Sequence, residues 1–200
     1  MNKWVIGARL RTLPAAISPV LSATGLAYNK NNSINLLNGL LALFVGISLQ
    51  VGVNYSNDYS DGIKGTDEER VGPIRLVASG LATSTAVKKA ALLTYLIGAI
   101  FGLALALRTN PLLILIGAIS IVAAWFYTGG KRPYGYKSLG EISVFIFFGL
   151  VATLGTYYTE SGKLTLWALA LAIEMGFLSC AILAVNNLRD LPKDALVGKH

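Results

Sequence analysis

Six long apolar segments constrain the fold of this chain more than any other feature of its sequence. Most of them approach the roughly 20 residues that a helix needs to cross about 30 Å of hydrocarbon. Charged residues make up only 14% of the chain, whereas soluble domains carry about 25%. We therefore expect an all-α fold, a polytopic transmembrane helical bundle. Its six spans are expected near residues 13–28, 36–53, 86–107, 111–127, 142–157 and 164–185.

The basic residues predict how this bundle is oriented. If the N-terminus is cytoplasmic, alternating spans leave only Lys30, Arg108 and Lys163 on the outer side, and 14 of the 17 Lys and Arg residues on the cytoplasmic side. Such a bias is what the positive-inside rule describes. Pro14 and Pro19 interrupt the first apolar segment and argue against a cleaved signal peptide. We expect a multi-pass protein of the cell membrane with its N-terminus in the cytoplasm.

Two clusters of amide and carboxylate side chains stand at the ends of apolar segments, both on the predicted cytoplasmic side. They are the first motif, Asn54-x3-Asp58-x2-Asp61, and the second motif, Asn186-x3-Asp190-x3-Asp194. Grouped carboxylates need a compensating cation, and an all-oxygen set suits Mg2+. Helix capping is the alternative, but negative charge at the C-terminal end of a helix opposes the helix dipole. We expect all six residues to be metal ligands.

The spacing within the motifs predicts how they are presented. On a helix, the three side chains of the first motif project from nearly one face. Asn186 and Asp190 repeat the spacing of Asn54 and Asp58, which predicts two related helical halves facing one another across a cavity. Because Pro192 stands before Asp194, we expect the helix to kink or restart there.

Basic residues suited to phosphate lie between the two motifs. Arg75 follows the first motif, while Lys131 and Arg132 lie in a loop rich in glycine and tyrosine. Their charges neutralise phosphoryl oxygens, although the positive-inside bias alone would also place them there. Together with a divalent metal they predict a membrane enzyme for phosphorylated substrates. A helix cap or a basic partner explains Glu141, and Glu174 has no assigned role.

Five strings of the sequence resemble the UbiA superfamily of aromatic prenyltransferases, and specifically its MenA branch. They are Gly7-Ala-Arg-Leu-Arg-Thr-Leu-Pro14, Val53-Asn-Tyr-Ser-Asn-Asp-Tyr-Ser-Asp-Gly62, Gly72-Pro-Ile-Arg-Leu-Val77, Tyr127-Thr-Gly-Gly-Lys-Arg-Pro-Tyr-Gly-Tyr136 and Asn186-Asn-Leu-Arg-Asp190. The resemblance implies transfer of a polyprenyl chain from its diphosphate to an aromatic acceptor. In the MenA branch the acceptor is 1,4-dihydroxy-2-naphthoate, which loses its carboxylate and gives demethylmenaquinol on the route to menaquinone.

The resemblance also implies roles for individual residues. Mg2+ held by the two motifs would bind the diphosphate, Tyr127 or Tyr134 would stabilise the allylic cation through its ring face, and Arg9 and Arg11 would meet the carboxylate of the acceptor. The expected catalytic residues are Asp58, Asp61, Asp190, Lys131 and Tyr127. The expected diphosphate-binding residues are Asn54, Arg75, Lys131, Arg132 and Asn186.

Members of this superfamily generally continue past the second motif through further helices, about nine in all. We therefore expect residues 1–200 to form a single transmembrane prenyltransferase domain that is incomplete at its C-terminal end and binds metal without normal turnover. The expected partners are polyprenyl diphosphate, 1,4-dihydroxy-2-naphthoate and the lipid bilayer, with no nucleic acid.

Three other functions stay open from the sequence. The first is a UbiA-type prenyltransferase that acts on a different aromatic acceptor. The second is a CDP-alcohol phosphotransferase, whose Asp-x2-Asp-Gly is matched by Asp58 to Gly62 but whose further acidic residues are missing from the same segment. The third is a cation carrier, which would hold its acidic residues near the bilayer midplane and not at the ends of helices.

Overall fold

The chain is helical throughout the part that the computed structural model describes, which covers residues 2–65 and 73–194, with side chains to residue 188. Within these ranges there are no strands, so the predicted all-α fold is confirmed. Helices stand at all six predicted positions. By length and composition, those over Leu36–Lys64, Ser84–Arg108, Gly140–Ser161 and Leu166–Leu188 are suited to cross a membrane, and Leu112–Phe126 is apolar but shorter.

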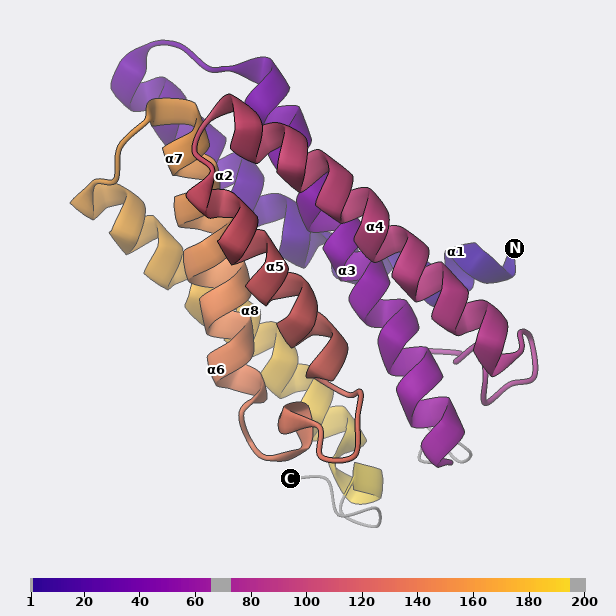
Figure 1. Cartoon of the computed structure of the whole chain (residues 1–200). Helices are drawn as coiled ribbons and strands as arrows, with labels where there is room; N and C mark the ends of the chain where they lie inside the picture. The colour runs from indigo at the N-terminus through magenta and orange to yellow at the C-terminus, as the bar shows by residue number, and fades with distance from the viewer. Residues whose placement is uncertain (1, 66–72, 195–200) are drawn as a thin grey trace.

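The first half of the bundle contains four helices. They are α2 (Leu13–Asn31), α3 (Leu36–Lys64), α4 (Ser84–Arg108) and α5 (Leu112–Phe126), with short connections between α2 and α3 and between α4 and α5. Figure 1 shows α3 and α4 running side by side along the bundle, and this pair packs more extensively than any other. Helix α3 extends well past the predicted span and carries the whole first motif in continuous helix.

Contacts with α4 determine which face of α3 carries the first motif. A Cβ on Gly52 would lie only 2.5 Å from the Cε1 atom of Tyr95, so the absence of a side chain at Gly52 lets the Tyr95 ring pack closely against α3. The Tyr95 hydroxyl also hydrogen-bonds the Ser56 hydroxyl at 2.8 Å. Since Gly52 and Ser56 face α4, Asn54 and Asp58 are turned about 200° from them, toward the opposite side of α3.

The second half contains two long helical stretches. The first is the continuous run of α6 (Gly140–Val144), the π-helix η3 (Phe145–Leu154) and α7 (Gly155–Ser161), and the second is α8 (Leu166–Asp194). The backbones of η3 and α8 touch, because a Cβ on Gly149 would lie 2.6 Å from the Cα of Gly176. Helix α8 continues through Pro192 to Asp194, so the helix does not restart at Pro192, and a kink there stays a prediction.

Helix α2 joins the two halves, since it packs against α3, α7, η3 and α8. Small side chains at Ala16, Ala23 and Ala27 are buried on it and allow its neighbours to approach closely. In this arrangement the C-terminal ends of α3 and α8 lie at the same end of the bundle (Figure 1). We call this end the site end.

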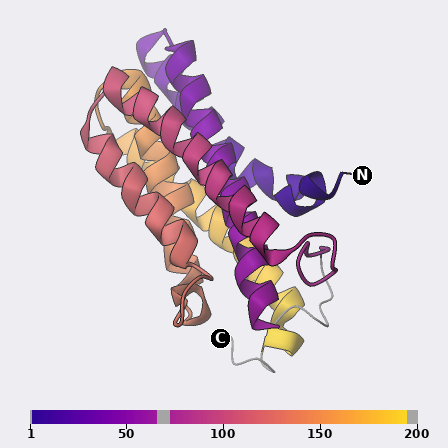
Figure 2. The same cartoon turned by 45° about the vertical axis from the view of Figure 1, so that its right-hand side comes forward.

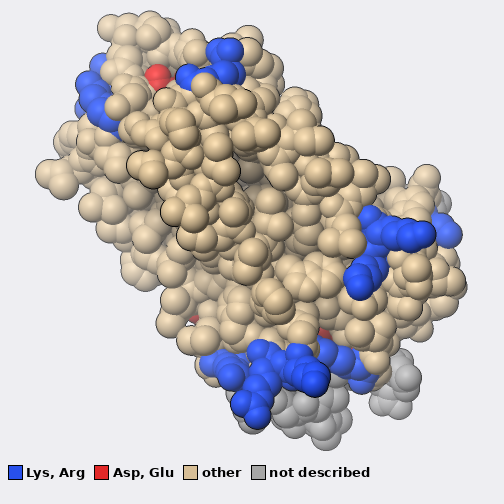
Figure 3. Space-filling view, in the orientation of Figure 1, with Lys and Arg blue, Asp and Glu red and all other residues tan. Residues whose placement is uncertain are grey.

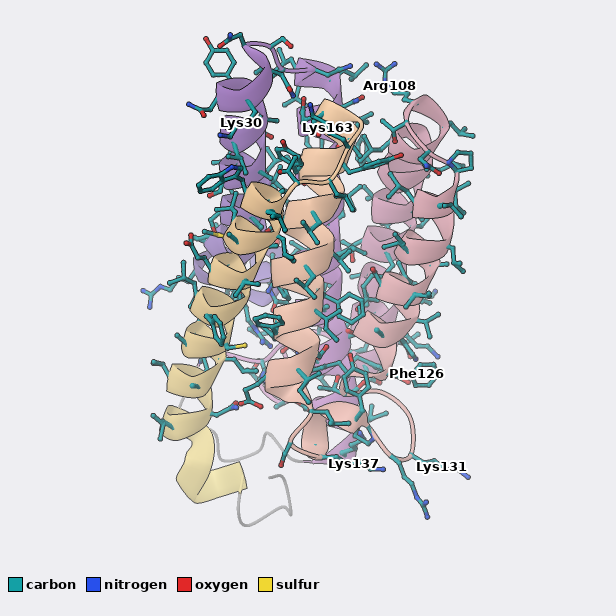
Figure 4. The ribbon with its side chains drawn as sticks, turned by 90° about the vertical axis from the view of Figure 1, so that its left-hand side faces the viewer. Lys30, Arg108, Phe126, Lys131, Lys137 and Lys163 are labelled. Carbon is teal, nitrogen blue, oxygen red and sulfur yellow. The ribbon has the colours of Figure 1, made fainter. Side chains whose placement is uncertain are left out.

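Charged side chains separate to the two ends of the bundle. Figure 3 shows Lys and Arg gathered there, with a broad band free of charge between them. Figure 4 shows Lys30, Arg108 and Lys163 together at the end opposite the site end, while Lys131 and Lys137 lie at the site end. This separation agrees with the two sides assigned from the sequence.

Candidate functional site

The N-terminal segment packs across the site end of α3. Figure 2 shows α1 (Lys3–Ala8) projecting sideways from the bundle. A Cβ on Gly7 would lie 2.5 Å from Leu76 Cδ1 and 2.9 Å from Tyr55 Cε1, so glycine at this position lets α1 rest on both side chains. The Tyr55 hydroxyl donates to the Trp4 carbonyl at 2.7 Å. These contacts belong to a buried apolar cluster that also includes Val87 and Ala91 of α4.

Arg9 ends α1 in the left-handed conformation, with φ of 51°. This conformation is uncommon for a residue with a side chain and is tolerated where the surroundings determine it. It turns the chain into the short helix η1 (Leu10–Thr12). The turn brings the Arg9 guanidinium into an ion pair with Asp58.

Asp58 is fully buried, with 0% of its surface exposed. Arg9 and Arg75 both donate to its Oδ1 atom, Arg75 at 2.9 Å. The backbone N–H of Leu76 donates to Oδ2 at 3.1 Å. A carboxylate removed from water needs such charged partners and hydrogen bonds, so the two guanidinium groups compensate the cost of burying Asp58.

Asp61 lies one turn further along α3 and is 1% exposed. The hydroxyl of Tyr136, in the short helix η2 (Tyr134–Tyr136), donates to its Oδ1 atom at 2.5 Å. The Nη2 atom of Arg75 lies 3.5 Å from its Oδ2 atom. Arg75 therefore bridges the two carboxylates of the first motif.

Asn54 points toward the N-terminal segment. Its side-chain amide donates to the Ala8 carbonyl and to the Thr12 hydroxyl, both at 2.9 Å. The amide of Gln50 donates to the Asn54 Oδ1 atom at 3.4 Å. The predicted common face is therefore present, and the segment from Ala8 to Thr12 contacts it at both Asn54 and Asp58.

The loop that follows α5 is tied to the end of α3. Lys64 Nζ donates to the Thr128 carbonyl at 2.7 Å and lies 4.9 Å from the centre of the Tyr136 ring. The Thr128 hydroxyl donates to Asn57 Oδ1 at 2.8 Å. These contacts hold Tyr136 over Asp61.

Lys131 and Arg132 belong to the same loop but do not reach the carboxylates. Both are exposed, and neither forms a hydrogen bond or ion pair with the part of the chain that the structure describes. Lys131 extends away from the bundle (Figure 4). Their predicted role in diphosphate binding stays a prediction.

Tyr127 and Tyr134 pack edge to face, with ring centres 5.5 Å apart. Burial raises the pKa of Tyr127 to about 12, and the nearby Tyr134, Glu141 and Asp61 add to this rise. Burial also raises the pKa of Tyr134, whose hydroxyl donates to the Ala123 carbonyl at 2.9 Å. Both side chains are therefore neutral phenols at ordinary pH, and stabilisation of a cation by either ring stays a prediction.

The second motif lies at the end of α8. Asn186 is partly exposed, and the backbone of Asp190 and Asp194 is helical, but these two side chains lie outside the described residues. The amide of the adjacent Asn187 donates to Glu141 Oε1 at 3.0 Å. Glu141, in the first turn of α6, thus links α6 to α8 beside this motif. Glu174 is exposed on α8.

Residues 16–200 match the UbiA prenyltransferase family. The chain belongs to this family. It is 53% identical, over 98% of its length, to a 1,4-dihydroxy-2-naphthoate octaprenyltransferase of Mycobacterium tuberculosis, of which it covers 67%. It is 37% identical, over 98% of its length, to the protein of the same name in Escherichia coli, of which it covers 66%.

A more distant relative is the UbiA prenyltransferase domain-containing protein 1 homolog of Drosophila melanogaster, which is 28% identical over 99% of this chain, with 56% of that protein covered. The chain thus spans about two thirds of the length of its bacterial relatives. The UbiA resemblance and its MenA branch are confirmed. Together with the apolar helices, they make this a multi-pass membrane protein.

The first motif is the part of this UbiA chain that offers buried oxygen donors to a divalent metal. Within residues 2–65 and 73–188, no three His, Cys, Asp or Glu side chains gather closely enough to hold a metal ion by themselves. The first motif instead offers two buried carboxylates and one amide oxygen on one face of α3. Hard divalent ions bind such oxygens, so the donor chemistry fits Mg2+ and its coordination stays a prediction.

Three residues of this UbiA site were missed by sequence reasoning. Arg9 was expected to meet the carboxylate of an acceptor, yet it pairs with Asp58. Tyr136 and Lys64 had no expected role, although they connect the loop after α5 to α3. The loop contains three tyrosines within ten residues, and nothing in their spacing distinguishes the one that reaches Asp61.

Proposed function

We propose that this protein transfers a polyprenyl group from polyprenyl diphosphate to 1,4-dihydroxy-2-naphthoate, with loss of the acceptor's carboxylate, and so forms demethylmenaquinol in menaquinone biosynthesis. The observation that carries the proposal is 53% identity over 98% of the chain to a relative bearing this activity in its name. The buried charged cluster around Asp58 supports it. The family match favours this reading over a CDP-alcohol phosphotransferase or a cation carrier.

The residues at the site end are suited to a diphosphate leaving group. We propose that Asn54, Asp58, Asp61, Asn186, Asp190 and Asp194 hold Mg2+. When bound, Mg2+ supplies positive charge that stabilises the diphosphate as the allylic carbon–oxygen bond breaks.

The side chains of the protein itself contribute donors and exclude water. Arg75 already touches both carboxylates of the first motif, so its guanidinium is near any phosphate that these carboxylates hold through metal. Lys131 and Arg132 extend from the loop at the same end, where they add positive charge to the approach of the substrate. The apolar helices keep water from the allylic cation until the electron-rich ring attacks it.

We also propose that the protein lies in the cell membrane with its N-terminus and its site end in the cytoplasm. Support comes from Lys30, Arg108 and Lys163, which lie together at the opposite end, while Lys131 and Lys137 lie at the site end (Figure 4). The other twelve of the 17 Lys and Arg residues belong to segments that the sequence assigns to the cytoplasmic side. This asymmetry is the pattern of the positive-inside rule.

Diphosphate release from polyprenyl diphosphate in the presence of Mg2+ and dihydroxynaphthoate tests the function. Because the bacterial relatives are longer, the assay uses the chain itself and a chimera in which the C-terminal third of the Mycobacterium tuberculosis relative follows residue 200. We expect prenylated naphthol from the chimera. Replacing dihydroxynaphthoate by other aromatic acids tests the acceptor. Release of CMP from a CDP-alcohol, without release of diphosphate from polyprenyl diphosphate, would refute the proposal.

A further inference from the structure

We propose that Arg9 and Arg75 are exchangeable counter-ions of Asp58, which hold this carboxylate until metal and diphosphate arrive together and then pass to the diphosphate. The inference rests on the proposed function and deepens it, because it states how the site loads. It predicts that divalent metal binds weakly alone and tightly with diphosphate.

The contacts of Asp58 carry the first step. Its Oδ1 atom accepts from both guanidinium groups, its Oδ2 atom accepts from the Leu76 N–H, and the side chain is fully buried. A divalent ion that approaches these oxygens alone meets two fixed positive charges in a poorly screened environment. Like charges in contact oppose its binding, so the guanidinium groups and the metal compete for one carboxylate.

Diphosphate removes this competition because it brings negative charge and acceptor oxygens. Guanidinium groups bind phosphoryl oxygens through two parallel hydrogen bonds. When diphosphate is present, Arg9 and Arg75 gain a new partner while the metal takes the carboxylates. Each ligand then strengthens the binding of the other, and this linkage is reciprocal.

The backbone places Arg9 for this role. Its left-handed turn follows α1, which Gly7 allows to rest on Leu76 and Tyr55. In the same segment, the Ala8 carbonyl and the Thr12 hydroxyl accept hydrogen bonds from the Asn54 amide. The N-terminal segment therefore contacts the first motif at both Asn54 and Asp58. When Arg9 changes its partner, the contacts of this segment change together with those of α3.

The test measures binding by the full chain in detergent micelles, with Mn2+ as a spectroscopic probe for Mg2+ and inorganic pyrophosphate as the anion. We expect pyrophosphate to tighten Mn2+ binding at least about tenfold. In Arg9→Gln, Mn2+ alone should bind about tenfold tighter, since one competing charge is gone, while pyrophosphate should bind more weakly. Arg9→Lys keeps the charge and should stay near wild type for Mn2+ alone.

Lys89→Gln is the matched control, since it removes one exposed positive charge at the start of α4. It should leave both affinities within about twofold. The inference is overturned if Arg9→Gln binds Mn2+ no tighter than wild type. It is also overturned if wild type binds Mn2+ equally well with and without pyrophosphate, or if wild type does not bind Mn2+ under either condition. Both of these measurements use wild type alone and do not depend on the folding of a variant.

These readouts separate the inference from the proposed function, because neither depends on prenyl transfer. Linked binding of Mn2+ and pyrophosphate without prenyl transfer by the chimera supports counter-ion exchange and refutes the assigned reaction. Prenyl transfer without linked binding refutes counter-ion exchange alone.

Discussion

Helix α3 carries a polar network at each of its ends, and the two networks differ in burial and in how their charges are paired. At its N-terminal end, Glu160 accepts from the Asn35 N–H at 2.7 Å, and the Asn38 amide donates to the Thr159 carbonyl at 2.7 Å. Arg108 donates to Asn38 Oδ1 at 3.1 Å. At the site end, the buried carboxylates of Asp58 and Asp61 pair directly with guanidinium groups, whereas the Glu160 carboxylate accepts from a backbone N–H.

The difference shows which network is suited to exchange partners. At the N-terminal end of α3, the hydrogen bonds of Glu160 and of the Asn38 amide are made to backbone groups in a fixed geometry, and such bonds have no substitute once broken. At the site end, another cation can replace a guanidinium without leaving Asp58 uncompensated. We therefore expect the N-terminal network to contribute to stability and the site-end network to contribute to catalysis.

The largest effect should come from Asp58→Asn. This change keeps the shape of the side chain but removes the charge that Arg9 and Arg75 share. We expect prenyl transfer by the chimera to fall by about two to three orders of magnitude. The free energy of unfolding should drop by about 3 kcal/mol, because Arg9 and Arg75 each lose one charged partner while Arg75 keeps Asp61. Product formation and thermal unfolding measure the two effects. Transfer within about twofold of wild type would contradict the role of Asp58.

Tyr136→Phe should have the next largest effect. It removes the hydroxyl that donates to Asp61 but keeps the ring beneath Lys64. A hydrogen bond to a charged group contributes about 1.5–3 kcal/mol, so we expect transfer to fall about tenfold or more.

Tyr158→Phe is the matched control for this change, because the Tyr158 hydroxyl accepts from the Asn110 amide near the opposite end of the bundle. It should leave transfer unchanged. Equal losses of prenyl transfer in Tyr136→Phe and Tyr158→Phe would show that the site end is no more important for catalysis than the opposite end.

A smaller effect, on stability alone, is expected for Glu160→Gln. The variant keeps one acceptor oxygen for the Asn35 N–H but loses its charge. We expect the free energy of unfolding to fall by about 1 kcal/mol, seen as a lower midpoint of thermal unfolding, with transfer retained. A loss of transfer comparable to that of Asp58→Asn would show that the N-terminal end of α3 also takes part in catalysis, which would contradict the expected division between stability and catalysis.

The last prediction concerns alkaline pH and leaves stability at neutral pH unchanged. The pKa of Tyr127 is raised from 10.0 to about 12, so the folded protein holds this proton more tightly than the unfolded chain does. The resulting stabilisation is complete below pH 10 and is lost as pH rises toward 12. We expect the thermal midpoint of wild type to fall more steeply than that of Tyr127→Phe across this window, and the two curves to run parallel from pH 6 to 9. Divergence below pH 9 would show that Tyr127 ionises earlier.

Apolar segments predicted the helices well because membrane spans need length and hydrophobicity above all else. The first motif was also placed correctly on one helix, since Asn54 and Asp58 stand one turn apart. The contact between Arg9 and Asp58 was not predictable, because it depends on Gly7 packing against Leu76, whose place only the tertiary fold determines. Pro192 was expected to make α8 kink or restart. The helix does not restart there, because Pro192 stands near the helix end and removes a single backbone hydrogen bond.

The docking of α1 has a consequence for the order in which the protein forms. The segment that carries Arg9 is synthesised before the side chains on which it rests, which are Tyr55 of α3, Leu76 of the segment before α4, and Val87 of α4. It must wait while α2 and α3 are made and the chain returns to the same side of the bundle. Arg9 therefore joins Asp58 only after the chain has been synthesised through Val87, so a segment that is made before α2 and α3 takes its place after them.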